Sequence, residues 1–499
     1  MGKVSRKVVS ESLWKFVSTI ITKAGALIFV VLLARFLRPE GFGVYNLAMA
    51  IVLTFTLLTD LGVNRTLLRY FSFSLGKKDK SKAVAYARYL FKIKFLIVTV
   101  FSILFLVLAY PLSFWVFKKP ELFWPLIILS IYLVVLSFEM FFEYFFYAIK
   151  KIKFLTIKEV FLQALRISFA LLVFAFLMGY NRILGIFVAV LFAHLFTSIF
   201  LFVLLKKHVS FIFEKSESKI NKKKLFSFLK YLAVGGISAM FFVYVDIIML
   251  GIFLPSTYVG YYSAAVALVG ALIFLIPASN VLLPVFTQLK KGQLKNSFDK
   301  VFKYVCLLSI PVIFGALAVG RYFIRVFYGY EYLPSLIPLY FLVFLVFSEV
   351  LTGTLISLFS AREKPQYFVK YLLIFSALNV ILNYFLIKFF INFSFELAMV
   401  GAAIATLTTR YSYMIALGII SVKKLNINYK LTHFVKPLIA SILMFLAIFY
   451  INYTIKDMTL LLGLGEILLG VFVYFILMFL MKGFRKEDFQ MIKDAIKNL

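Results

Sequence analysis

The chain has 499 residues and a formal net charge of +33; 63% of its residues are hydrophobic and only 15% are charged. Its mean hydropathy of +1.01 lies far outside the range of soluble globular domains and predicts a polytopic membrane protein. The single cysteine, Cys306, excludes an internal disulfide and argues against a cysteine-based metal site.

Windows of about 20 apolar residues predict membrane-spanning helices along the whole chain. In chain order they cover residues 13–35, 42–64, 95–117, 122–148, 155–179, 183–205, 231–254, 258–288, 304–327, 336–360, 371–390, 396–421, 437–455 and 458–481. The first apolar run continues beyond a signal-peptide core without a clear cleavage site, so we expect it to be retained. The fold class is therefore an all-α polytopic membrane protein of about fourteen helices.

Lysine and arginine residues are distributed unevenly across this topology. Forty-one of the 54 lie before the first span or in every second connection, including the four from Lys150 to Lys158. Eight lie in the opposite connections, among them Lys118 and Lys119, and five lie within spans. This asymmetry follows the positive-inside rule and predicts a cell-membrane protein with both termini cytoplasmic. It also accounts for the net charge without nucleic acid as a partner, leaving contact with anionic membrane lipids as a secondary role.

A short internal repeat predicts two similar halves. The stretch FLRPEGFGVYNLA, residues 36–48, aligns with FLPSTYVGYYSAA, residues 253–265, and pairs Gly43 with Gly260. Pro39, Gly41 and Gly43 predict a chain reversal over about six residues between the first two spans. We expect an N-terminal lobe over residues 1–210, a cytoplasmic linker over 211–224, a second lobe over 225–425, and a helix pair with a cytoplasmic tail over 426–499, with the lobes related by an axis along the membrane normal.

Four cations are predicted at membrane depth, where each costs about 2.5–3.5 kcal/mol on insertion and usually faces a cavity or a partner. Lys15 and Lys23 lie on one face of the first span, and Lys23 falls close to its midpoint. Arg166 and Arg410 fall near the midpoints of the fifth and twelfth spans. The hypothesis is a cationic cavity that binds an anionic headgroup such as a sugar pyrophosphate.

Five carboxylates are also predicted within spans: Asp246, Glu349, Glu139, Glu143 and Asp60. Glu139 and Glu143 form an i, i+4 pair in the inner half of the fourth span. Two interpretations remain open for these acids. They form structural ion pairs with the intramembrane cations, or they bind a coupling H⁺ or Na⁺.

Other chemistry finds little support in the sequence. No phosphate-binding G-x-x-x-x-G-K-[ST] motif occurs, and His194, His208 and His433 show no ligand spacing, so we expect neither a metal site nor a cofactor. The connections are too short to fold a catalytic domain with its own core. We therefore expect a transporter and not an enzyme.

Residues 32–72, LLARFLRPEGFGVYNLAMAIVLTFTLLTDLGVNRTLLRYFS, resemble the opening of the polysaccharide biosynthesis transporters. These are the O-antigen flippase (Wzx-like) family of the multidrug/oligosaccharidyl-lipid/polysaccharide superfamily. The resemblance rests on Leu37 to Gly43, Tyr45 and the Asp60-Leu61-Gly62 triplet that precedes Arg65 and Arg69. The stretch DIIMLGIFLPSTYVGYYSAA around Asp246 and the tail KGFRKEDFQMI resemble the family as well.

The resemblance implies movement of a polyprenyl-linked oligosaccharide from the cytoplasmic to the outer leaflet, by alternating access through a charged cavity between two lobes. Glycan-assembly proteins would then be partners. The last two helices resemble those of lipid II flippases, whose cationic residues do not match here position by position, which disfavours lipid II itself. The alternatives are a cation-coupled drug or metabolite exporter of the same superfamily, expected to have twelve spans, and a membrane enzyme acting on lipid-linked glycans.

Overall fold

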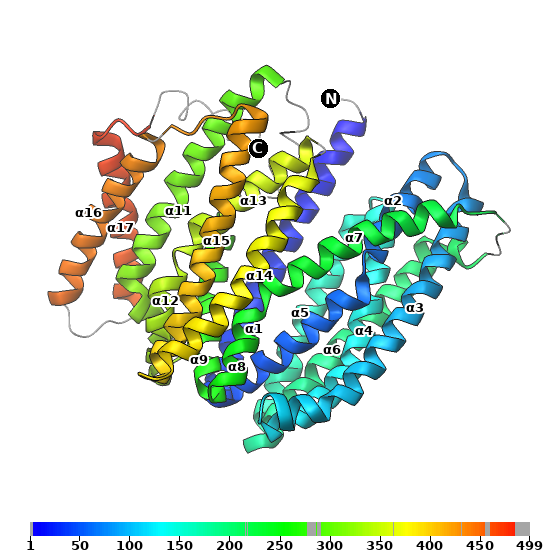
Figure 1. Ribbon diagram of the computed structural model, residues 1–499, viewed down its shortest axis with the longest axis horizontal. Coiled ribbons are helices and arrows are strands. Elements are labelled where there is room, and N and C mark those ends of the chain that lie inside the picture. Colours follow the sequence, from blue (N-terminus) through cyan, green and yellow to red (C-terminus); the bar gives the residue numbers. More distant parts are fainter. Residues whose placement is uncertain are drawn as a thin grey trace. The chain divides into compact units, whose positions relative to one another are not determined.

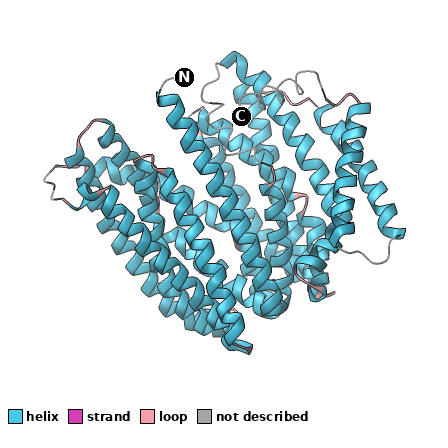
Figure 2. Ribbon diagram, turned by 180° about the vertical axis from the view of Figure 1, so that it is seen from behind, coloured by secondary structure: helices cyan, strands magenta, loops and turns pink. Residues whose placement is uncertain are grey.

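A computed structural model describes residues 3–214, 216, 218–276, 286, 291–362, 364–430, 432–454 and 460–484. These residues form helices and connecting loops, with no strand among them (Figures 1 and 2). The all-α class expected from composition is confirmed for this part of the chain.

The helices, in chain order, are α1 (Lys3–Asp60), α2 (Val63–Gly76), α3 (Lys80–Pro111), η1 (Leu112–Val116), η2 (Pro120–Leu122), α4 (Phe123–Ala148), α5 (Ile152–Phe176), α6 (Gly179–His208), η3 (Ser210–Phe213), α7 (Lys222–Val243), α8 (Val245–Phe253), α9 (Ser256–Phe274), α11 (Lys291–Phe327), η4 (Tyr330–Ser335), α12 (Leu336–Leu342), α13 (Leu345–Ala361), α14 (Pro365–Phe390), α15 (Phe395–Leu425), α16 (Thr432–Thr454) and α17 (Leu460–Leu480).

The chain divides into two compact units, Met1–Ser263 and Ala264–Leu499, which we call unit 1 and unit 2. Unit 1 contains α1 to α8 and the start of α9, so α7 and α8 pack with the preceding helices. Unit 2 contains the remaining elements. The lobe boundaries predicted near residues 210 and 225 remain predictions.

Ten described helices are long and apolar enough to cross a membrane, or eleven when a bent pair is taken as one span. The predicted count of fourteen is therefore not reached in the described part of the chain. The first two predicted spans form one continuous candidate, Val17–Gly76. The tenth predicted span is bent by 47° between Leu342 and Leu345, and the fourteenth leaves only the shorter apolar helix Gly465–Leu480.

The turn predicted between the first two spans is a kink at one residue. Arg38 has φ 58° and ψ 175°, and Pro39 then begins the second helical segment of α1. A residue that precedes proline is disfavoured in the right-handed helical region, whereas proline is well suited to the first position of a helix. Gly41 and Gly43 are consequently helical, so the chain changes direction at Arg38 and not over the six residues predicted.

The two repeat stretches pack directly against each other inside unit 1. A Cβ atom on Gly43 would overlap the carbonyl oxygen of Ser256, and a Cβ atom on Gly260 would overlap the carbonyl oxygen of Pro39. In the repeat alignment Gly43 corresponds to Gly260 and Pro39 to Ser256, so the contact is reciprocal. Small residues permit such close approach of helix backbones in membranes, where lipid supplies little hydrophobic drive for association.

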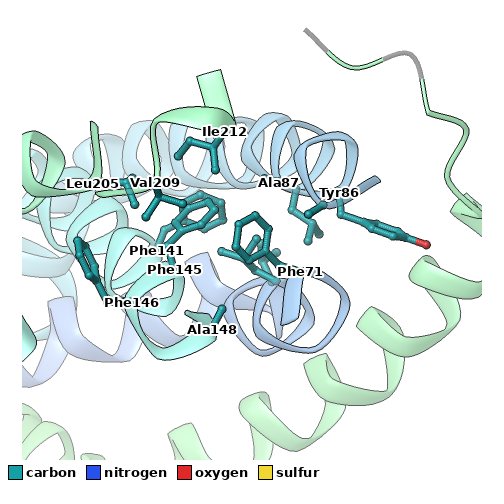
Figure 3. Packing of buried hydrophobic residues seen from close by; sticks show 14 of the residues in the cluster. Phe71, Tyr86, Ala87, Phe141, Phe145, Phe146, Ala148, Leu205, Val209 and Ile212 are labelled. Carbon is teal, nitrogen blue, oxygen red and sulfur yellow. The ribbon is translucent and has the colours of Figure 1, made fainter. Parts of the chain in front are cut away.

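A cluster of buried aromatic and aliphatic side chains joins one end of the unit 1 helices. Phe71 of α2 packs edge-on against Phe145 of α4 (Figure 3). Phe71 also stacks with Phe211 of η3. Tyr86 of α3 and Leu225 of α7 belong to the same cluster. It fixes the ends of α4, α5 and α6, the helices that carry the charged residues described below.

In unit 2, α14 and α15 make a close pair. A Cβ atom on Gly401 of α15 would lie 2.8 Å from the carbonyl oxygen of Leu386 on α14. Asn379 of α14 also donates to the hydroxyl of Thr409 on α15 at 2.9 Å. The helices α16 and α17 pack on α11, where the Tyr474 hydroxyl donates to the carbonyl of Leu307 at 2.8 Å.

Candidate functional site

Arg166 lies near the middle of α5 among aromatic side chains. Its guanidinium carbon is 4.2 Å from the centroid of the Phe29 ring of α1, a distance typical of a cation–π contact. The hydroxyl of Tyr45 is a further neighbour of the guanidinium. Arg166 is half-buried, and its Nε atom has no hydrogen-bond partner in the described chain. No carboxylate of the described residues pairs with this cation.

Lys23 lies on α1 with its side chain exposed. The opposite face of α1 contacts α5, since Thr156 donates to the carbonyl of Trp14 at 3.0 Å and Gly25 lies against Gln163. With 3.6 residues per turn, Lys23 is rotated roughly 160–180° away from this contact line. Lys23 has no ion pair among the described residues. Lys15 belongs to the same helix, but its side chain lies outside the described set.

Glu139 and Glu143 belong to a buried group of five ionisable side chains, which we name the α4–α6 charge cluster. Its members are Glu139 and Glu143 of α4, Lys158 and Glu159 of α5, and His194 of α6. The Nζ atom of Lys158 lies 3.0 Å from Glu139, 2.7 Å from Glu143 and 2.9 Å from Glu159. His194 Nδ1 lies 2.8 Å from the second carboxylate oxygen of Glu139.

Tyr132 connects this cluster with Arg166. Its ring meets the His194 ring edge-on with a centroid distance of 5.1 Å. Arg166 and Glu139 are both charged neighbours of its phenol. Since Tyr132 is 3% exposed, this connection runs through the buried interior of unit 1.

Asp60 ends α1, where Leu61 and Gly62 have positive φ and the chain turns into α2. Its carboxylate accepts from the backbone N–H of Asn64 at 3.1 Å. The Nζ atom of Lys94 is 3.9 Å from that carboxylate and donates to the carbonyl of Thr59 at 3.0 Å. Asp60 therefore stabilises the break between α1 and α2.

In unit 2, Arg410 Nη1 lies 3.1 Å from Glu349 Oε1. These two residues therefore form an ion pair, as in the first of the two interpretations of the intramembrane acids. Glu349 lies on α13, shortly after the bend that separates α12 from α13, and Arg410 lies on α15.

Asp246 lies in the first turn of α8, and its Oδ2 atom accepts from the hydroxyl of Tyr262 at 2.9 Å. Tyr262 is fully buried and belongs to the second repeat stretch. The structure thus places Asp246 beside the repeat contact in unit 1.

Several buried lysines lie outside the candidate residues predicted from the sequence, among them Lys158, Lys94 and Lys119. Lys158 was counted with a cytoplasmic connection, yet its side chain is 3% exposed and lies within the α4–α6 charge cluster. Lys94 and Lys119 are 1% and 8% exposed. Position 158 does fall inside the predicted span 155–179. A lysine within a span, 15 residues after Glu143, could therefore have indicated a buried cation in the sequence. No group of three metal-ligating side chains occurs in the described ranges.

The sequence profile of the family described as "Polysaccharide biosynthesis protein" matches residues 8–290. A relative from Haloferax volcanii, named probable low-salt glycan biosynthesis flippase Agl15, is 28% identical over 202 residues. That alignment covers 38% of this chain and 40% of the relative, so the match spans well under half of the relative's length.

Two solved structures show the same fold. A structure titled lipid II flippase MurJ in an inward closed conformation has a TM-score of 0.74 at 16% identity, covering 93% of this chain and 97% of that one. An inward-facing multidrug resistance MATE family transporter of the MOP superfamily has a TM-score of 0.62 at 12% identity, covering 83% of this chain and 99% of that one. At these identities the likeness concerns the fold alone.

Proposed function

Because the chain belongs to the polysaccharide biosynthesis protein family, we propose that it is a flippase for a lipid-linked glycan. Its substrate would be a polyprenyl-linked oligosaccharide, moved from the cytoplasmic to the outer leaflet of the cell membrane by alternating access. Both termini would be cytoplasmic, as the distribution of lysine and arginine indicates. The glycan flippase name of the Haloferax volcanii relative supports this proposal.

The observation that carries the proposal is the setting of Arg166. An arginine at membrane depth normally has a carboxylate partner, because an unpaired charge there is costly. Arg166 instead has an aromatic ring and a phenol around it and a buried Nε atom without a partner in the described chain. A planar guanidinium in this state suits a phosphate oxygen, which it would bind through its free N–H groups.

Lys23 would provide a second positive charge for the same headgroup. Its exposed position on the face of α1 turned away from α5 leaves the ammonium accessible. A pyrophosphate carries several negative charges. The Lys23 ammonium on α1 and the planar Arg166 guanidinium on α5 would complement it. Lys15, which lies on the same predicted face of α1 as Lys23, would add a further positive charge. Arg410 is a weaker candidate because Glu349 already neutralises it.

The expected architecture of two six-helix lobes and a C-terminal helix pair remains part of the proposal. The packing of α16 and α17 on α11 supports an added pair at the end of the chain. A drug exporter of the same superfamily, the main alternative, would not need such a pair. The absence of a catalytic role is likewise proposed: the substrate would leave chemically unchanged.

The proposal is tested by following lipid-linked glycan in cells that depend on this protein. In Arg166→Ala and Lys23→Ala variants, we expect the lipid-linked glycan to accumulate on the cytoplasmic leaflet while the protein still inserts. Arg166→Lys should retain part of the export, since the charge remains but the bidentate fork is lost. The matched control is Lys388→Ala, which removes an exposed lysine of α14.

Normal glycan export by both Arg166→Ala and Lys23→Ala would remove the anion site from the proposal. Export of cationic drugs, with no change in glycan display when the protein is absent, would instead identify the exporter alternative.

A further inference from the structure

The α4–α6 charge cluster carries more negative than positive charge. Lys158 faces three carboxylates, those of Glu139, Glu143 and Glu159. With all acids ionised and His194 neutral the formal charge is −2, and with His194 protonated it is −1. Either value is costly for a group in which Glu139 and Lys158 are 2% and 3% exposed, because a charge buried away from water loses its hydration.

The geometry of the cluster offers a direct way to remove this charge. Lys158 and His194 occupy different oxygens of Glu139, so this carboxylate is fully engaged at both. Glu143 and Glu159 are each paired with Lys158, and their side chains are 20% and 19% exposed. A proton from water can therefore reach the outer edge of the cluster and add to a carboxylate oxygen there.

We propose that the α4–α6 charge cluster is a proton-binding site, in which Glu143 and Glu159 share one exchangeable proton. With His194 and Lys158 charged and one carboxylic acid neutral, the cluster has no net charge. The step is a simple acid–base equilibrium: a proton from water adds to a carboxylate oxygen and returns to water in the reverse direction.

The site is coupled to the proposed anion site through Tyr132. The Tyr132 ring contacts the His194 ring, and both Arg166 and Glu139 are charged neighbours of this tyrosine. An anion bound at Arg166 cancels the positive charge that favours ionised carboxylates in the cluster. Anion binding therefore promotes protonation, and by reciprocity protonation tightens anion binding. This coupling rests on the proposed function, whereas the proton site itself does not.

Two tyrosines of α4, Tyr132 and Tyr144, lie beside the cluster. Arg166 of α5 is a charged neighbour of Tyr132, and Asp60 of α1 and Arg65 of α2 are charged neighbours of Tyr144. Tyr144 interacts with Glu143, Asp60 and Arg65, and Lys94 partly neutralises Asp60. The two arginines favour ionised carboxylates and Asp60 opposes them, so an anion that neutralises Arg166 shifts this balance towards protonation.

The proton is detected without substrate by infrared difference spectroscopy of the full chain in lipid nanodiscs. On lowering the pH, we expect a carboxylic acid C=O band that shifts in D₂O. The band should be lost or displaced in Glu143→Gln and Glu159→Gln. The matched control, Glu349→Gln, alters an acid of unit 2 paired with Arg410 and should leave the band unchanged. A spectrum without such a band at any pH at which the protein is folded would overturn the proton site.

Coupling is measured by calorimetric titration of the same nanodiscs with a polyprenyl pyrophosphate in buffers of different ionisation enthalpy. We expect net uptake of a proton on binding, and an apparent Kd that falls by up to about tenfold for each unit of decreasing pH, the limit for one linked proton. Glu143→Gln should bind without proton uptake. Binding by the wild type with no uptake and no pH dependence would refute the coupling.

The two measurements separate the inference from the proposed function. If the pyrophosphate does not bind at any pH, the anion site and the coupling both fail, while the infrared band still decides the proton site. If the pyrophosphate binds and the band is absent, the anion site stands and the proton site fails.

Discussion

The Nζ atom of Lys119 donates to the carbonyl oxygen of Gly251 at 2.6 Å, and the same ammonium donates to the carbonyl of Leu254 at 2.7 Å. These carbonyls end α8, where the helix dipole favours a positive charge. Lys119 therefore closes the C-terminus of α8 from the loop between α3 and α4. Nearby, Ser256 donates to Glu121 at 3.1 Å, so the loop holds the turn that follows α8 at two points.

Replacing Lys119 by methionine should loosen this turn, because the α8 carbonyls lose both hydrogen bonds and a complementary charge. A contact of this kind contributes on the order of 1–2 kcal/mol. In a Cys306→Ala, Ser256→Cys background, we expect Lys119→Met to increase labelling by a membrane-impermeant maleimide about tenfold. Lys118→Met, which removes the exposed neighbouring lysine, should leave the labelling rate unchanged.

The same lysine predicts a pH dependence of stability. Burial lowers the pKa of Lys119 below its ordinary value of 10.5, and Glu121 opposes the shift. Between the lowered value and 10.5, the unfolded chain holds more protons on this lysine than the folded chain does. The free energy of unfolding therefore gains a contribution that rises with pH in this alkaline window. Thermal unfolding of wild type and Lys119→Met across the window should reveal the difference, and parallel pH profiles would contradict it.

The reciprocal contact between the two repeat stretches predicts equal effects at its two glycines. Gly43→Ala and Gly260→Ala should each destabilise the protein by about 1–3 kcal/mol, because the new methyl group meets a backbone carbonyl that cannot move aside. The control is Gly270→Ala in α9, where a Cβ atom would meet nothing within 4 Å. Thermal stability in one detergent measures all three. A neutral Gly43→Ala variant would exclude the close approach.

Lys158→Met should be the most destabilising of these substitutions, since it leaves three buried carboxylates without their shared cation. Removing one partner from a buried ion pair costs about 3–5 kcal/mol. Adding Glu143→Gln should recover part of the loss, because one negative charge goes with it. Lys153→Met, at an exposed position on the same helix, is the matched control, and the melting temperature is the readout. A Lys158→Met variant as stable as this control would mean that the cluster is solvated.

Apolar periodicity predicted the helices well because membrane spans are long and uniform. It could not predict that α1 continues through the first two spans, since the kink depends on the single left-handed residue Arg38. It also missed the division of the seventh predicted span at Tyr244, between α7 and α8. Such breaks depend on local backbone geometry, to which a hydropathy window is blind.

The candidate site was predictable where charge alone was informative. Arg166 and Glu139 stood out because ionisable residues are rare in spans. Lys158 and Lys119 did not, because both lie near predicted ends, where lysines are ordinarily solvated. Only packing shows that their ammonium groups turn inward, and packing depends on residues far away in the chain, such as His194 and Gly251.

The reciprocal contact of Gly43 and Gly260 has the form of an isologous interface within one chain, in which the same patch meets its own copy. In a dimer of two identical half-length chains related by a two-fold axis, the same glycine of each subunit would make this contact. Duplication and fusion would then join two subunits whose interface already existed, after which each half could change independently. The equivalent contacts that Gly43 and Gly260 make are what such a symmetric ancestor would have left in the present chain.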